Sequence, residues 1–406
     1  MRRRDVLIGL GAAAVGGRAR GAEPAGARPP LSPLLPEGTR SQAALEALPG
    51  KQPLIKLTYR PPNYEAPLAN FRTAITPNDH FFVRYHLAGL PDEASLASWS
   101  LRIFGDGAAH PLVLTLRDLE QRFAPVEMTA VNQCSGNRRG LFSPHVAGVQ
   151  WGAGAMGNAV WRGVRLRDVL AEAGVRPEVV EVAFRGADGP VLETTPPFRK
   201  SLPLAKANDE SVLIAYAMNG EKLPFYNGYP ARLIVPGWTG TYWVKHLTEI
   251  ELRTKPLDSF WMQKAYRVPE GMFPVALPFA SQTFGGSTPI TEVVVNSLIT
   301  QPEDGAGLSR DHFVLRGVAW DSGKGISSVE VSLDGGQSWQ SAELGRDLGR
   351  FSFREFSLVP SGLAPGKLAI MARARNQAGE VQADRLKQNP AGYNNNVPQT
   401  VTVTLT

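Results

Sequence analysis

Residues 326–339 read ISSVEVSLDGGQSW and give the clearest structural signal in the C-terminal part of the chain. Up to Leu333 the stretch largely alternates between apolar and polar side chains, which is typical of a strand with one buried face. Asp334 and Gly335 follow, and an Asp-Gly pair supplies the positive φ angles that a tight hairpin turn requires. The stretch therefore predicts a β-hairpin.

The same pattern extends in both directions from this hairpin. Beyond about residue 285 the helical periodicity disappears, and strand-like segments are separated by turn residues roughly every ten positions. These segments are TEVVVNSLI (291–299), HFVLRGVAW (312–320), GRFSFREFSL (349–358), GKLAIMARARNQ (366–377) and QTVTVTL (399–405). We expect an immunoglobulin-like β-sandwich over residues 285–406, a module that carries interfaces more often than chemistry.

The preceding part of the chain, residues 71–284, has a mixed pattern. Short β-branched and aromatic runs, such as EVVEVAFRG (178–186), alternate with helix-like stretches such as LTLRDLEQRF (114–123) and LRDVLAEAG (166–174). The helices are too few and too irregular for a doubly wound parallel sheet. We therefore predict an α+β domain, and two domains suit a chain of 406 residues.

The first residues have the layout of an export signal. Arg2 to Arg4 precede a short apolar run from Val6 to Val15, and small residues follow it. This layout predicts a signal over residues 1–22, and the adjacent arginines favour the twin-arginine route over an ordinary secretory signal. The mature chain is then expected in the periplasm. Since that route carries folded proteins, a cofactor inserted before export is expected with it.

Residues 23–70 are rich in proline, which disfavours regular secondary structure. We expect an extended arm that lies over the main domain, and the alternative is a disordered leader up to about residue 50. No other apolar stretch approaches the roughly 20 residues that cross a bilayer, so no membrane span is predicted.

Charge and cysteine content narrow the class of protein. The formal net charge is +6, and no basic run of the kind that binds nucleic acid is present, so a small anionic substrate is the better expectation. Cys134 is the only cysteine. A single cysteine excludes an intramolecular disulfide, a CxxCH haem site, an iron–sulfur cluster and a CxxC zinc site. Any redox centre in this chain uses one thiolate at most.

Cys134 lies in VNQCSGNRRG (131–140), a polar stretch with two arginines. A lone cysteine is often a small core hydrophobe, which is one interpretation. The other is a pocket thiol, because guanidinium groups lower the pKa of a neighbouring thiol towards the thiolate that metals and electrophiles need. The polar neighbours favour the pocket, although the residues alone leave both interpretations open.

Two further segments carry candidate anion contacts. In HFFVRYHL (80–87), Arg84 and His86 project from the same face if the segment is a strand, and the alternative is a surface strand with solvated charges. In NGYPARLIVPGWTGTYWVKH (227–246), the glycines allow a close backbone approach, while Arg232 and Lys245 are able to hold phosphate. Neither segment contains a nucleotide-binding fingerprint.

Four ordered motifs resemble the sulfite oxidase family of molybdopterin enzymes, and in particular bacterial periplasmic sulfite dehydrogenase catalytic subunits. They are VNQCSGNRRG (131–140), AMGNAVWRGVRLRDVL (155–170), NGYPARLIVPGWTGTYWVKH (227–246) and FWMQKAYRVP (260–269). The resemblance runs from about residue 70 to the end of the chain. It implies a mixed α/β molybdopterin domain over residues 71–284 and a dimerisation domain over residues 285–406.

The resemblance also implies a molybdenum–molybdopterin cofactor, with Cys134 as the one protein ligand of the metal. A soft thiolate suits a metal that cycles between oxidation states. By matching position, the catalytic residues are Arg84, His86, Arg139 and Tyr266. The matching cofactor contacts are Phe82, Val83, Arg84, Tyr85, His86, Cys134, Asp188, Asn227, Arg232, Trp243, Val244 and Lys245. Without the resemblance, Tyr266 is better interpreted as a core or interface tyrosine, and Asp188 as a turn residue.

The sequence departs from the family's pattern in two respects. Vertebrate and plant relatives have histidine where this chain has Asn227, so we expect an altered hydrogen bond to the pterin there. Vertebrate relatives also carry an N-terminal haem domain, for which the proline-rich arm leaves no room. We therefore expect no haem in this chain and electron transfer to a separate c-type cytochrome.

The resulting hypothesis is a sulfite dehydrogenase catalytic subunit that acts as a homodimer. Within the family, the alternatives are oxidation of a sulfane substrate and reduction of nitrate. A different class is a Cys–His hydrolase that uses Cys134. A third is a binding protein whose sandwich is an adhesion module, which leaves the arginines beside Cys134 unexplained. Arg138 has no assigned role and is expected to face solvent or the electron acceptor.

Overall fold

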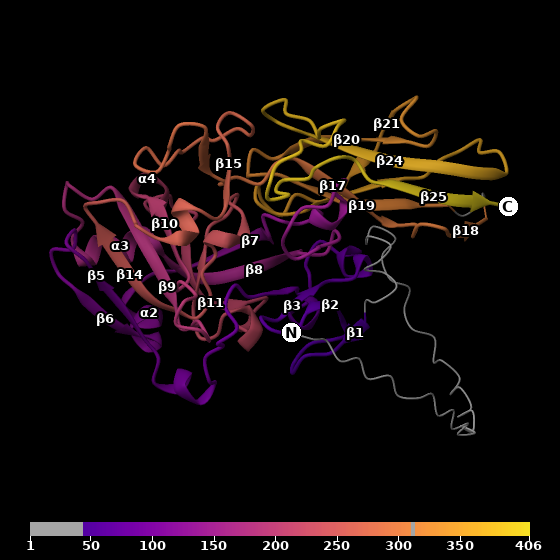
Figure 1. Cartoon of the computed structure of the whole chain (residues 1–406). Helices are drawn as coiled ribbons and strands as arrows, with labels where there is room; N and C mark the ends of the chain where they lie inside the picture. The colour runs from indigo at the N-terminus through magenta and orange to yellow at the C-terminus, as the bar shows by residue number, and fades with distance from the viewer. Residues whose placement is uncertain (1–43, 310–312) are drawn as a thin grey trace, which may run out of the picture. The chain divides into compact units, whose positions relative to one another are not determined.

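The computed structural model of the protein describes residues 44–309 and 313–406 (Figure 1). The predicted export signal and the first part of the predicted arm lie outside the described residues. Residues 44–70 do not form the irregular arm that their prolines suggest. They contain three short strands that join a fourth in the order β1-β2-β3-β4. The strands are β1 (Ala44–Glu46), β2 (Leu54–Thr58), β3 (Asn63–Glu65) and β4 (Val83–Arg84).

The prediction of an arm without regular structure is therefore wrong for residues 44–70. Its prolines lie between elements, where proline is tolerated: Pro61 and Pro62 form the turn between β2 and β3, and Pro67 precedes a 3-10 turn. Because β4 carries Arg84, this sheet holds one wall of the candidate site.

Two larger sheets form the central part of the chain, called the catalytic part below because it was predicted to carry the site, and the one parallel pair among their described strands joins β14 to β5. The first has the order β10-β9-β14-β5-β6, with β5 (Ser100–Phe104), β6 (Leu112–Thr115), β9 (Glu181–Gly186), β10 (Arg199–Pro203) and β14 (Leu247–Arg253). The second has the order β12-β11-β8-β7, with β7 (Pro125–Gln133), β8 (Met156–Arg165), β11 (Leu213–Met218) and β12 (Glu221–Lys222). A further strand, β13 (Arg232–Ile234), pairs with β11. Strand β7 ends directly before Cys134.

The described helices are short, so the chain is mostly sheet with few helices. They are α2 (Leu116–Arg122), α3 (Leu166–Ala173), α4 (Leu204–Ala207) and α5 (Phe260–Gln263). Five short 3-10 turns also lie in this part: η2 (Asn78–His80), η3 (Ala94–Ser98), η4 (Arg139–Leu141), η5 (Phe225–Asn227) and η6 (Gly240–Tyr242). Another, η1 (Leu68–Phe71), follows β3. None of the described helices combines the length and the apolar character that crossing a bilayer requires.

Both helices expected from the sequence are present, for local reasons. The hydroxyl of Thr115 and the carboxylate of Asp118 form a capping box at the start of α2. Helix α3 buries Leu166, Val169 and Leu170 on one face, and each such burial contributes about 1.5–3 kcal/mol.

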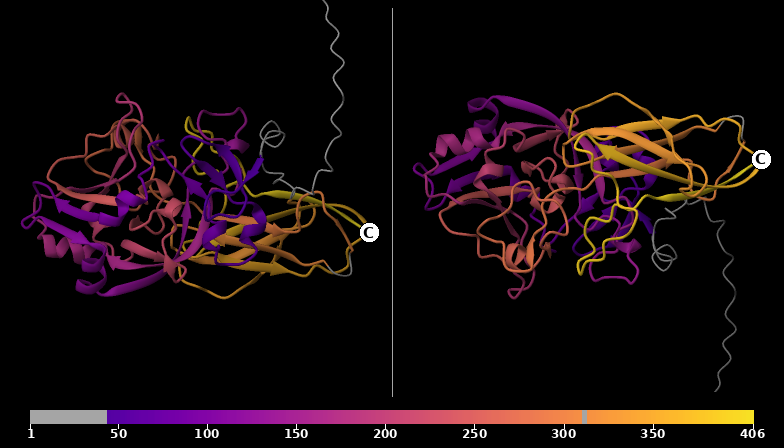
Figure 2. Two further views of the ribbon diagram at one scale, coloured as in Figure 1. Left: turned by 90° about the horizontal axis from the view of Figure 1, so that it is seen from below. Right: turned by 90° about the horizontal axis from the view of Figure 1, so that it is seen from above.

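The C-terminal part consists of two sheets around one core. One has the order β17-β19-β23-β22, with β17 (Asn296–Gln301), β19 (Leu315–Trp320), β22 (Glu343–Leu344) and β23 (Arg354–Leu358). The other has the order β18-β25-β24-β20-β21, with β18 (Gly307–Leu308), β20 (Ile326–Ser332), β21 (Gln340–Ser341), β24 (Gly366–Asn376) and β25 (Thr400–Leu405). Leu315 and Phe356 of the first sheet and Val331 and Val401 of the second share a single core. Both views of Figure 2 show these strands, in orange to yellow, gathered together.

The predicted hairpin is present, because β20 pairs with β21 in an antiparallel arrangement. Gly335 and Gly336 adopt positive φ angles, and Asp334 accepts hydrogen bonds from the backbone N–H groups of Gln337 and Ser338. The connecting loop is longer than a two-residue turn, because β20 ends at Ser332 and β21 begins at Gln340. The carboxylate of Asp334 organises this loop. The specific immunoglobulin-like arrangement stays a prediction.

The C-terminal part also braces the strand that leads to Cys134. Val131 of β7 packs in one cluster with Leu298, Val318 and Trp320. The indole N–H of Trp320 donates to Oε1 of Gln133 at 2.6 Å. A short pair of strands, β15 (Arg267–Pro269) and β16 (Ser287–Pro289), lies on the connection between the two parts. The end of β7 is thus held by both halves of the described chain.

Candidate active site

Cys134 begins a tight turn after β7. Its backbone N–H donates to the carbonyl of Ala155 at 2.9 Å, and its own carbonyl accepts from Asn137 N–H at 3.0 Å. The side-chain Oδ1 of Asn137 accepts from the N–H of Ala155 at 3.0 Å. The Cys134 side chain is 7% exposed and lines a pocket with polar and aromatic walls. The thiol is therefore both buried and accessible from the pocket, which combines the two interpretations left open by the sequence.

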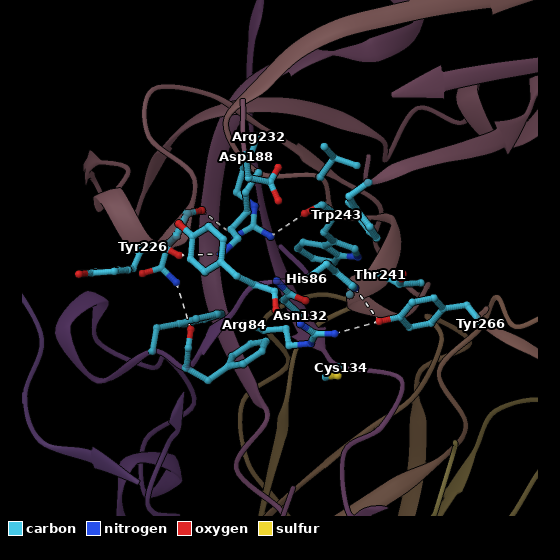
Figure 3. A pocket seen from close by; sticks show the side chains of 18 residues that line it. Arg84, His86, Asn132, Cys134, Asp188, Tyr226, Arg232, Thr241, Trp243 and Tyr266 are labelled. Atoms are coloured by element: carbon cyan, nitrogen blue, oxygen red, sulfur yellow. Dashed lines mark hydrogen bonds between the residues drawn. The ribbon is translucent and has the colours of Figure 1, made fainter. Parts of the chain in front are cut away.

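Three predicted catalytic side chains converge beside this thiol. Figure 3 shows Arg84 and His86 directed towards Tyr266, with Cys134 close to Arg84. Nη2 of Arg84 donates to the Tyr266 hydroxyl at 3.1 Å, and Nε2 of His86 lies 2.6 Å from the same oxygen. Although strand β4 covers only two residues, Arg84 and His86 still point into one pocket.

The proton positions in this cluster follow from the pKa directions. Burial and the positive charge of Arg84 lower the pKa of His86 well below its ordinary value, so its ring is neutral. Arg84 only donates, so the Tyr266 oxygen accepts from it and directs its own hydrogen to Nε2 of His86. Burial raises the pKa of Tyr266, which keeps the hydroxyl protonated. Burial lowers the pKa of Arg84, but the neighbouring Tyr266 and Cys134 raise it, and the net shift is upward.

Tyr266 is held in a strained backbone conformation. Its φ angle is +58°, a left-handed value that bulky residues rarely adopt. The hydrogen bond from Ile290 N–H to the Tyr266 carbonyl at 2.8 Å helps to hold it, and the ring stacks on Tyr393 with centroids 5.6 Å apart. Such outliers cluster at functional sites because the surrounding structure must over-determine them.

The other end of the pocket is rich in cations. Figure 3 shows Arg232 and Asp188 well separated from Cys134. Nη1 and Nη2 of Arg232 donate to the carbonyls of Asn227 and Trp243, at 2.8 and 3.2 Å. Nζ of Lys245 donates to the Tyr226 carbonyl at 3.1 Å. Neither cation forms an ion pair with a carboxylate in the described part of the chain.

The pKa values at this end reflect burial of positive charge. Burial lowers the pKa of Lys245 well below its ordinary value, and Arg232 lowers it further. Burial also lowers the pKa of Arg232 to about 9. The carboxyl of Asp188 has a pKa raised by burial to about 6, although Lys245 opposes this shift. An anion at this end would favour the charged form of both cations.

Most of the predicted site residues line this one pocket. The lining residues that the sequence predicted are Phe82, Arg84, Tyr85, His86, Cys134, Asp188, Asn227, Arg232, Trp243, Val244, Lys245 and Tyr266. Two predicted residues do not line it. The side chain of Val83 packs with Leu54 and Tyr64 in the N-terminal sheet. The guanidinium of Arg139 lies over the Tyr393 ring at 5.3 Å and is not among the residues that line the pocket. The functional roles of both stay predictions.

Sequence reasoning missed several lining residues. They are Phe81, Asn132, Phe198, Tyr226, Gly240 and Thr241. Most lie beside a predicted residue or within a quoted motif, so proximity could have flagged them. Phe198 has no such signal, although its ring stacks on His86 with centroids 3.7 Å apart. Lys200 was also missed: its ammonium lies over the Tyr266 ring at 5.1 Å, and burial lowers its pKa well below the ordinary value.

Arg138 corrects an expectation. Its side chain does not face solvent, because it is 2% exposed. Nη1 donates to the carbonyl of Val397 at 2.9 Å and Nη2 to that of Ser297 at 2.8 Å. The side-chain amide of Asn395 donates to the Arg138 carbonyl at 3.2 Å. Arg138 therefore ties the cysteine turn to the C-terminal sheets.

The polar groups of the pocket fit a molybdopterin. One thiol lies at one end, while at the other lie Arg232 and Lys245, which have no carboxylate partner among the described residues. Nε of Arg232 and Oγ1 of Thr241 are buried without a hydrogen-bond partner among the described residues. Buried donors of this kind need a partner that the protein does not supply. A group with a soft metal at one end and a phosphate at the other fits this donor set.

Comparisons with known proteins agree with this fit. Residues 87–261 match the family model described as oxidoreductase molybdopterin binding domain. Residues 287–406 match the model described as Mo-co oxidoreductase dimerisation domain. The first match supports a molybdenum–molybdopterin cofactor in this chain.

Individual relatives give the same result. Mitochondrial sulfite oxidase of Rattus norvegicus is 36% identical over 305 residues, which cover 73% of this chain and 54% of that protein. Sulfite oxidase of Arabidopsis thaliana is 32% identical over 335 residues, which cover 79% of this chain and 83% of that protein. The chain thus spans about half the length of the rat relative. This chain belongs to the sulfite oxidase family.

A solved structure supports the fold. The sulfane dehydrogenase SoxCD from Paracoccus pantotrophus matches with a TM-score of 0.71 and 28% sequence identity. The match covers 94% of this chain and 92% of that one. The mostly sheet architecture is therefore that of a sulfite-oxidase-type fold.

Proposed function

We propose that this protein oxidises sulfite to sulfate at a molybdenum centre and passes the electrons to a c-type cytochrome. The observation that carries the proposal is the cluster of Arg84, His86 and Tyr266 beside Cys134. Family membership adds independent support, since both relatives named above are sulfite oxidases.

In the proposed enzyme, Cys134 holds the metal, while Asn227, Arg232 and Lys245 hold the anionic end of the pterin. When bound, the cofactor supplies the oxygen-atom transfer and redox chemistry that protein side chains lack. The protein supplies binding, orientation and charge.

Arg84 is the residue that first meets the substrate's negative charge. Its side chain is partly buried, so its attraction for a sulfite oxygen is stronger than at a fully exposed position. Tyr266 offers one O–H donor, which a substrate oxygen can take over from His86. Because His86 is neutral, its lone pair competes for that hydrogen without adding positive charge. The cluster thus orients an oxyanion through hydrogen bonds, while the proton stays on the Tyr266 oxygen.

The proposal is tested with purified, molybdenum-replete protein. Sulfite-dependent reduction of cytochrome c or ferricyanide is expected to saturate with sulfite concentration. A protein that contains stoichiometric molybdenum and pterin but reduces neither acceptor would contradict the proposal.

The likeness to a sulfane dehydrogenase favours one second candidate, oxidation of a sulfane sulfur. The same assay with a persulfide substrate in place of sulfite separates the two. A higher kcat/KM for the persulfide would favour the second candidate.

A Cys–His hydrolase has less support, because Nε2 of His86 is engaged by Tyr266. A hydrolase of this class would be active without molybdenum, so metal analysis of the active protein tests it.

The remaining parts of the hypothesis are location and assembly. We propose export by the twin-arginine route to the periplasm, which cell fractionation and the mass of the mature N-terminus test. We also propose a homodimer, supported by the dimerisation-domain match. Sedimentation equilibrium is expected to give twice the mass of one chain.

A further inference from the structure

Lys51 is a buried cation outside the segments matched to the family. It lies in the turn between β1 and β2 and is only 7% exposed. Its ammonium donates to the carbonyl of Asn78 at 2.6 Å and to Oδ1 of Asn227 at 2.5 Å. It forms no ion pair with a carboxylate of residues 44–309 or 313–406. Burying a charge without such a partner is costly, so a compensating group is expected.

The contact with Lys51 fixes the orientation of the Asn227 amide. An ammonium has donors only, so the atom of Asn227 that faces it must be the oxygen. The amide nitrogen then points the other way, and one of its hydrogens is donated to the Phe82 carbonyl at 3.3 Å. The second N–H hydrogen is left for the pocket, which Asn227 lines. With Lys51 in place, Asn227 is a donor towards the pocket, which suits an anion.

Lys51 also adds to an excess of positive charge. Lys245 has its pKa lowered by burial and by the neighbouring cations, of which Arg232 has the largest effect and Lys51 is one. Burial lowers the pKa of Lys51 itself to about 7. Asp188 is the only carboxylate among the described lining residues. Arg232, Lys245 and Lys51 therefore outnumber this one carboxylate, and a bound anion would favour the charged form of both lysines.

We propose that Lys51 is a positioning residue for the phosphate end of the cofactor, acting through Asn227 and through its own charge. The N-terminal sheet then contributes to cofactor binding from outside the matched molybdopterin-binding domain. The inference rests on the molybdopterin cofactor and not on sulfite as the substrate.

The first test measures cofactor retention. Holoprotein with Lys51→Met, Lys51→Arg or no substitution is dialysed, and the pterin that remains is measured by fluorescence after oxidation. Lys51→Met is expected to lose pterin about tenfold faster or more, the effect of one charge-assisted hydrogen bond. Lys51→Arg keeps the charge and is expected to restore most of the retention. Lys56→Met is the matched control, because Lys56 lies in the same sheet and pairs with Glu46 instead.

The second test separates positioning from folding. Inorganic phosphate is titrated into cofactor-free protein by calorimetry, with chloride as the ionic control. We expect Lys51→Met to weaken phosphate binding about tenfold, while its melting temperature stays near that of Lys56→Met. Unchanged pterin retention and phosphate affinity in Lys51→Met would overturn the proposal. Full pterin retention without sulfite oxidation in the unsubstituted protein would count against the proposed function and leave this inference intact.

Discussion

The hydroxyl of Tyr266 takes part in two hydrogen bonds of opposite direction, from Arg84 and to His86. From the sequence, Tyr266 could be identified only through the resemblance to a family, whereas the spacing of Arg84 and His86 had already made them candidate anion contacts. The strained φ angle of Tyr266 and its stacking on Tyr393 depend on segments far apart in the chain, which no local pattern reports. Cys134 could also be singled out without the resemblance, because its uniqueness and its polar neighbours are visible in the sequence itself.

Arg84→Gln is expected to raise the KM for sulfite about tenfold or more, because a neutral side chain no longer neutralises the substrate. Steady-state kinetics measure the effect. Arg117→Gln, at an exposed position on α2, is the control and should leave KM unchanged. A KM within about twofold of the original for Arg84→Gln would show that this arginine does not bind the anion.

Tyr266→Phe is expected to lower kcat about tenfold or more, because the ring keeps its stack on Tyr393 while the O–H donor is lost. The melting temperature should stay close to that of the unsubstituted protein. Stopped-flow reduction by sulfite separates this step from the oxidation by cytochrome. An unchanged rate of reduction would remove Tyr266 from the catalytic residues.

At the scale of elements, the sequence predicted the C-terminal strands and both longer helices correctly, because their apolar periodicity is local. The strands of residues 44–70 were missed, since each is short and bounded by prolines. Their role depends on tertiary contacts. Glu65 of β3 is buried, and its Oε2 accepts from Gly152 N–H at 2.7 Å, next to the residues that hold the cysteine turn.

Glu65 gives this element a dependence on pH. Burial raises the pKa of Glu65 to about 8, although hydrogen bonds from Gly152 and Gly154 oppose the shift. The native state therefore holds this proton at pH values where the unfolded chain has released it. The contribution of Glu65 to the free energy of unfolding is present below its unfolded pKa, about 4.3, and falls as pH rises through about 8.

Glu65→Gln keeps a carbonyl acceptor for Gly152 but cannot ionise. The difference between the melting temperature of Glu65→Gln and that of the unsubstituted protein is expected to increase by at least about 2 °C as the pH rises from about 5 to about 9. Differential scanning calorimetry across this range measures the difference. If the plots of melting temperature against pH were parallel for the two proteins, Glu65 would not titrate between about pH 5 and pH 9.

At the scale of the whole molecule, the C-terminal part contacts the residues of the candidate site directly. Tyr393 stacks on Tyr266, and Asn394 N–H donates to the Ser135 carbonyl at 3.2 Å. Arg138 adds two hydrogen bonds to carbonyls of the C-terminal part. The segment near Tyr393 therefore supports both the cysteine turn and the proposed substrate tyrosine. Sequence spacing could not predict this contact between segments more than a hundred residues apart.

Arg138→Met is expected to lower the free energy of unfolding by about 2 to 4 kcal/mol, because it leaves one buried and one partly buried carbonyl without their donor. Chemical denaturation measures this change. Arg122→Met, which removes an exposed ion pair with Glu172, is the control and should cost less than about 1 kcal/mol. An equal effect in the two variants would contradict the structural role of Arg138.

The single thiol of this chain has a practical consequence for studying it. Cys134 is the only cysteine, so every covalent label that a maleimide reagent attaches reports on one atom. It lies at the wall of the pocket and is 7% exposed, so labelling requires entry through the pocket. A thiolate engaged by a metal is protected from alkylation, whereas a free one is not. Mass spectrometry of labelled protein therefore counts the loaded and empty molecules in a preparation, with no background from other sites.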